Sequence, residues 1–97
     1  MQLARTSPNE LTITGNIKSM ADYLAIRQQV GALVAGGASA LTLRINDSFS
    51  MPSSVIGFFV KLIHQDKIQV SMLIQDPRLL ELLEELNLAE LFGARQS

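Results

Sequence analysis

The feature that most limits the fold is a repeated change of hydrophobic period along the chain. Apolar residues alternate with polar ones in residues 40–45 and again in residues 67–75, as in strands with one buried face. Between them, residues 53–64 carry apolar side chains at helical spacing. A strand–helix–strand unit places its two strands parallel, joined by a right-handed crossover. The sequence therefore predicts an α/β fold.

The first part of the chain adds a hairpin and a helix. Residues 2–5 and 11–14 are short β-like pieces, and the segment between them is rich in turn formers. Ser19 and Asp22 have the spacing of a capping box, which predicts a helix from about Met20. The Gly36-Gly37 pair should end that helix.

The last part of the chain should contain a third main helix. Asp76 followed by Pro77 is typical of a helix start. We expect the helix to end at Asn87 and a short turn to follow over residues 89–92. The predicted order is β-β-α-β-α-β-α, a mixed four-stranded sheet in a single domain over residues 1–97.

The alternation also predicts how the layers pack. One side of the predicted strands is apolar, with Leu41, Leu43, Ile45, Ile68, Val70 and Met72. The opposite side is polar, with Thr12, Thr14, Thr42, Arg44, Gln69 and Ser71. Because a sheet covered on both faces has strands that are apolar throughout, we expect the three main helices to pack mostly on one face.

Composition excludes several classes of protein. The 97 residues are 47% hydrophobic and 18% charged, which suits one ordinary globular domain. The net charge of −1 argues against a domain that binds nucleic acid through its phosphates. There is no cysteine, so disulfides and thiolate metal sites are excluded. Neither a bilayer-spanning apolar run nor a signal-peptide core is present, and we expect a cytoplasmic protein.

The candidate functional segment is a serine-rich loop that leads into the central helix. Ser53 and Ser54 should lie at the start of this helix, where backbone N–H groups and the helix dipole favour an anion. A phosphate could be held there, either bound or covalently attached. The alternative, which local chemistry alone favours, is that these serines and Pro52 only cap the helix and form its first turn.

The central helix also has a polar stripe. At 100° per residue, Gly57, Lys61 and His64 fall within about 80° of Ser54, and Phe58 lies at about 40°. A solvated face is one interpretation. The other is a docking face, because an aromatic ring beside small and polar residues suits contact with a partner.

The sequence gives little support for a catalytic site or a metal site. His64 is the only histidine, and no Ser-His-Asp arrangement can be assembled around it. Metal-ligand spacing and glycine-rich phosphate loops of the known types are absent from the sequence. We therefore expect a protein that is not an enzyme and needs no metal or cofactor.

Four segments together resemble a STAS domain, the anti-sigma-factor-antagonist module. Residues 13–17 resemble its glycine segment before the first helix, and residues 41–45 its strand before the phosphorylation loop. Residues 51–57 resemble its serine turn, and residues 76–92 its closing helix and Leu-Phe tail. Pro52 replaces the usual aspartate and Val55 the usual glycine, and the chain stops soon after Phe92, without the last strand and helix of many members.

The resemblance implies a regulatory protein-binding module of bacterial signal transduction. In that family a turn serine is phosphorylated by an anti-sigma kinase, which switches partner binding; by the motif it is Ser53, with Ser54 the second candidate. The docking residues expected here are Ser50, Met51, Ser53, Ser54, Gly57, Phe58, Lys61 and His64.

Two other functions stay open at this point. One is an accessory subunit held on the ATPase of a membrane transport complex. The other is a sensor of a nucleotide or phosphate ligand at the helix N-terminus. From charge and hydropathy we expect no nucleic-acid partner and no direct membrane insertion, and a homodimer is compatible with the sequence.

Overall fold

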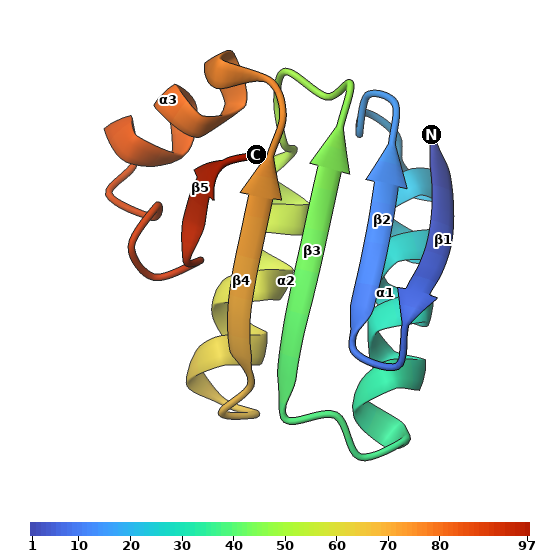
Figure 1. The fold of residues 1–97 in the computed structure, drawn as a ribbon. Helices are drawn as coiled ribbons and strands as arrows, with labels where there is room; N and C mark the ends of the chain where they lie inside the picture. The colour runs from blue at the N-terminus through green and yellow to red at the C-terminus, as the bar shows by residue number, and fades with distance from the viewer.

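The computed structural model describes residues 1–97 and has an α/β fold (Figure 1). In chain order, its elements are β1 (Gln2–Ser7), β2 (Glu10–Thr14), α1 (Met20–Ala35), β3 (Ala40–Asn46), α2 (Ser53–His64), β4 (Gln69–Ile74), α3 (Pro77–Glu85) and β5 (Ala94–Gln96). The three helices and the first four strands were predicted from the sequence, with small differences at their ends.

The sheet contains one strand more than predicted. Its order is β1-β2-β3-β4-β5, with β1 antiparallel to β2 and all other neighbours parallel. The prediction of four strands, with none after Phe92, is therefore wrong. With only three residues, β5 is too short to show a period of two. Gly93 leads into it with φ +57°, and a Cβ there would lie 2.7 Å from the Val70 carbonyl oxygen.

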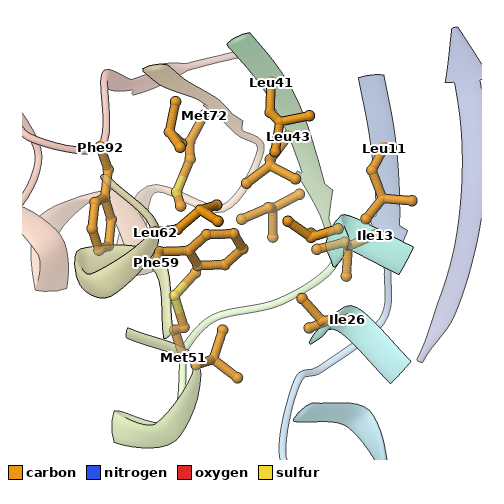
Figure 2. Close-up of a cluster of buried hydrophobic side chains, with 14 of the residues drawn as sticks. Leu11, Ile13, Ile26, Leu41, Leu43, Met51, Phe59, Leu62, Met72 and Phe92 are labelled. Carbon is orange, nitrogen blue, oxygen red and sulfur yellow. The ribbon is translucent and has the colours of Figure 1, made fainter. Parts of the chain in front are cut away.

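Helices α1 and α2 cover one face of the sheet, as Figure 1 shows, and α3 lies beside the β4–β5 edge. The apolar side of the strands faces the helices: Leu41, Leu43, Ile45, Ile68, Val70 and Met72 are all buried, as predicted. Figure 2 shows part of this core, which α2 joins through Phe59. Helix α3 adds Leu79 and Leu83.

The opposite face of the sheet carries no helix and is polar, in agreement with the prediction. Its threonines and serine are half-buried, and Gln69 is exposed. Arg44 on β3 pairs with Glu10 on β2, with 3.6 Å between Nη2 and Oε1. None of the three helices combines the length and apolar character needed to cross a bilayer.

Two helices begin at the caps that the sequence predicts. At α1, the Ser19 side chain accepts from the Asp22 N–H, and Asp22 accepts from the backbone N–H groups of Lys18 and Ser19. The hydrogen bond from the Lys18 backbone is the main reason why the pKa of Asp22 lies below its ordinary value. At α3, Asp76 accepts from the Arg78 N–H. That helix ends at Glu85, two residues before the predicted end, and Asn87 follows with φ 58°.

Candidate functional site

The loop before α2 is fixed by hydrogen bonds to both neighbouring loops. The Ser48 hydroxyl is fully buried; it accepts from the Ile17 N–H at 3.2 Å and donates to the Ser50 carbonyl at 2.9 Å. On the other side, the Asp47 N–H donates to Gln75 Oε1 at 2.8 Å. Ser48 therefore has a structural role, and it sets the position from which α2 starts.

A cation–π contact holds the outer side of the same loop. The Arg78 guanidinium carbon lies 5.0 Å from the centre of the Phe49 ring. Arg78 also pairs with Asp76, with 2.7 Å between Nη2 and Oδ2. The hydrogen bond from the Arg78 side chain lowers the pKa of Asp76, and the same bond raises the pKa of Arg78.

Helix α2 begins without a side-chain cap. Its N-cap is Pro52, and no side chain accepts a hydrogen bond from its first turn. Ser53 and Ser54 are both exposed, and their hydroxyls make no hydrogen bond in the structure. The positions agree with the alternative interpretation, in which Pro52 caps the helix and the serines form its first turn, but neither serine side chain makes a capping hydrogen bond. Both hydroxyls are accessible at the positive end of the α2 dipole.

Helices α1 and α2 lie on the covered face of the sheet (Figure 1). A groove of about 640 Å³ runs between them. It is open to solvent along its outer side. The groove is lined by Tyr23, Arg27, Gly31, Val34 and Ala35 from α1, by Ser54, Gly57, Phe58, Lys61 and Leu62 from α2, and by Asp66 beyond its end. It therefore begins at the serine turn and extends over most of both helices.

Ring contacts and glycines give the groove its shape. Tyr23 and Phe58 meet edge to face with ring centroids 6.4 Å apart, which joins the first turn of α1 to the middle of α2. Gly31 of α1 and Gly57 of α2 have nothing within 4 Å of the place where a Cβ would be. Neither glycine is therefore required for close packing inside this chain. Their effect is to leave the space between the helices empty.

The charges in the groove are mainly positive. Arg27 and Lys61 line it from opposite helices, and neither forms an ion pair within the chain. Asp66 is the one acidic residue of the lining, and it follows the end of α2. The groove thus offers two unpaired cations to whatever enters it.

The structure brings together four of the predicted docking residues, Ser54, Gly57, Phe58 and Lys61, in this groove. Ser53 and His64 are exposed on α2 outside the groove lining, and Ser50 is half-buried. Met51 is only 5% exposed and belongs to the core, where Figure 2 draws it near Phe59. The prediction that Met51 contacts a partner is therefore wrong, because its apolar side chain turns inward.

Sequence reasoning missed the α1 side of the site. Tyr23 and Val34 of that helix are half-buried, and both line the groove. The available signal was the spacing of Arg27 and Gly31, which places them on the same side of the helix as Tyr23. No group of three or more histidine or acidic side chains lies close enough to hold a metal ion.

No protein-family model, curated protein or solved structure matches this chain.

Proposed function

We propose that this chain is a STAS-like regulatory module without catalytic activity, which docks a protein partner through the α1–α2 groove and the serine turn. The observation that carries the proposal is the groove itself. It lies between the polar stripe of α2 and one side of α1, and it is lined by aromatic rings, small residues and unpaired cations. Aromatic residues and arginine are the side chains that contribute most to binding at protein interfaces.

Phosphorylation of Ser53, or of Ser54 as the second candidate, is the proposed control of docking. Both hydroxyls are exposed at the first turn of α2, and Ser54 lines the groove. A phosphate would bring about −1.5 to −2 charges to the positive end of the helix dipole, so folding should not suffer. It would also place a strongly hydrated group at the mouth of the groove. Ser53→Asp should therefore weaken docking, whereas Ser53→Ala should leave it intact.

The test is site-specific photo-crosslinking in the native host. A photoreactive residue at Lys61 should capture a partner, and the same residue at Arg95, an exposed position on β5, is the matched control. The partner is then identified by mass spectrometry, purified and titrated against the wild-type chain. Lys61→Glu should weaken this binding by about tenfold or more, which corresponds to about 1.4 kcal/mol.

The identity of the partner separates the two forms of the proposal. A serine-kinase-like anti-sigma factor would make the chain a signalling antagonist, and a transporter ATPase would make it an accessory subunit. Equal crosslinking at Lys61 and Arg95, or affinity unchanged by Lys61→Glu, would contradict docking through the groove.

A second candidate function is the sensing of a nucleotide or phosphate ligand. It is favoured by the uncapped start of α2, which opens into a groove that contains Arg27 and Lys61. Calorimetric titration with ATP, GTP and inorganic phosphate tests it. Saturable binding that is lost in Arg27→Ala would support this function, and absence of heat at millimolar ligand would reject it.

A further inference from the structure

The groove continues along α1 as a stripe that a single rod-shaped partner could cover. Met20, Leu24, Arg27 and Gly31 recur at intervals of four, three and four residues, which places them on one side of the helix. The core stripe of α1, with Ile26, Val30 and Leu33, lies on a different side. Met20 and Leu24 are 66% and 52% exposed, so this second stripe has no cover within the chain.

The backbone chemistry of the groove favours a helix as its occupant. The walls are two α-helices, whose backbone N–H and C=O groups are bonded internally and offer nothing to an incoming chain. An extended peptide would bury its own backbone groups there without partners. A helix satisfies its backbone itself, and Gly31 and Gly57 leave room for its close approach.

The charges indicate which kind of helix fits. Arg27 and Lys61 are unpaired on facing walls, so acidic side chains on the occupant would gain ion pairs with them. A second copy packed groove to groove would instead bring these cations towards their own counterparts. Helix α3 of a second copy is acidic, but its Leu79 and Leu83 are fully buried and cannot enter a groove.

We infer that the α1–α2 groove binds one amphipathic helix of another protein, about four turns long, with an apolar face over Tyr23, Leu24 and Val34 and acidic side chains at Arg27 and Lys61. The length follows from the distance between Met20 and Ala35, about 22 Å at 1.5 Å per residue. This inference rests on the proposed docking function and adds the structure and charge of the docked segment.

Selection from a displayed peptide library tests the inference without knowledge of the natural partner. The library contains peptides of about 18 residues, half with helical and half with alternating apolar patterns, and with Asp, Glu, Lys or Arg at the polar positions. Selection against the wild-type chain should enrich acidic peptides of helical pattern. Enrichment of alternating or basic peptides, or recovery of no binder, would overturn the inference.

Variants of the chain then show where the selected peptide binds. The affinity of the best acidic peptide should fall by about tenfold or more in Gly57→Leu, which fills the groove, and in Arg27→Glu, which reverses one charge. Ala32→Leu places the same leucine side chain on an exposed part of α1 outside the groove and should bind like wild type. Circular dichroism confirms that each variant is folded. Equal affinity for wild type and Gly57→Leu would place the peptide elsewhere and overturn the inference.

The two proposals can fail separately. If crosslinking at Lys61 captures a partner whose binding depends on Lys61, but selection returns no acidic helix, the helix inference fails and the docking function stands. If size-exclusion chromatography with light scattering finds a dimer that Arg27→Glu alters, the occupant is a second copy and the inference is wrong.

Discussion

Helix α2 buries Val55 and Phe59 completely against the sheet, whereas its side towards α1 carries Ser54, Gly57 and Lys61 beside open space. The first side is packed as protein interiors are, and each side chain there contributes to stability. The second side includes a helical glycine that touches nothing. A glycine in a helix costs about 0.8–1 kcal/mol relative to alanine, and α1 carries another one at Gly31. The difference indicates that the groove side is not optimised for stability, which is consistent with the proposed docking function.

Phe58 and Phe59 are neighbours on α2, but the loss of each ring should lower the stability of the chain by a different amount. Phe59→Ala should destabilise the chain by about 3–5 kcal/mol, because Phe59 is fully buried in the core. Phe58→Ala should cost about 1–2 kcal/mol, because that ring is half-buried and packs at the groove. Urea unfolding of both variants measures the difference. Equal losses would place Phe58 in the core and remove it from the proposed docking surface.

Loss of a buried hydrogen bond in the loop before α2 should lower the stability of the chain, as mutations on the buried side of α2 do. Ser48→Ala leaves the Ile17 N–H and the Ser50 carbonyl without their partner, so it should cost about 1–3 kcal/mol. Ser50→Ala is the control, because the Ser50 side chain makes no hydrogen bond in the structure. If chemical denaturation gave the same midpoint for Ser48→Ala and wild type, the anchoring of the loop would have to be reconsidered.

Substitution of the two groove glycines, Gly31 and Gly57, should raise the stability of the chain. Gly31→Ala and Gly57→Ala should each stabilise the chain by about 0.5–1 kcal/mol, because the added methyl groups meet open space in a regular helix. Gly37→Ala is the matched control at the end of α1; its φ of +102° should make the substitution destabilising. Thermal unfolding measures all three. A loss of stability in Gly31→Ala would show that the side chains around Gly31 leave no room for a methyl group.

The smallest effect concerns the charge at the start of α3. The pKa of Asp76 in the folded chain lies below its ordinary value of 3.8, so its ionised form stabilises the fold above about pH 3.8. This contribution is lost as the pH falls through the lower, folded-state pKa. Asp76→Asn keeps a capping side chain and should be less stable than wild type at pH 7. The difference should shrink below pH 3.8, and a constant difference between pH 7 and pH 2.5 would reject the ion pair as its cause.

Most of the fold could be predicted because local patterns and tertiary structure agree. The alternation in β3 and β4 and the caps at Ser19 and Asp76 each point to the element that forms. Strand β5 could not be predicted in this way, because its pairing depends on the close approach of Gly93 to β4, a contact between distant parts of the chain.

The site could be predicted only on one of its two walls. The wheel of α2 correctly grouped Ser54, Gly57, Phe58 and Lys61, since residues on one helical side are defined by spacing alone. Spacing groups Arg27 and Gly31 with Tyr23 on α1, but which side of α1 faces α2 depends on how both helices lie on the sheet. The burial of Met51 could not be predicted from spacing either, because it depends on the hydrogen bonds that fix the loop around Ser48.

The docking proposal implies that the space between α1 and α2 is kept open for a partner at the expense of stability. Gly31→Leu tests it when the free energy of unfolding and the affinity for the crosslinked partner are measured on the same preparation. We predict that stability rises by about 0.5–1 kcal/mol, because leucine is a better helix former than glycine. Affinity should fall by about tenfold or more, because the leucine side chain occupies the groove. Unchanged affinity in a variant of higher stability would contradict the claim.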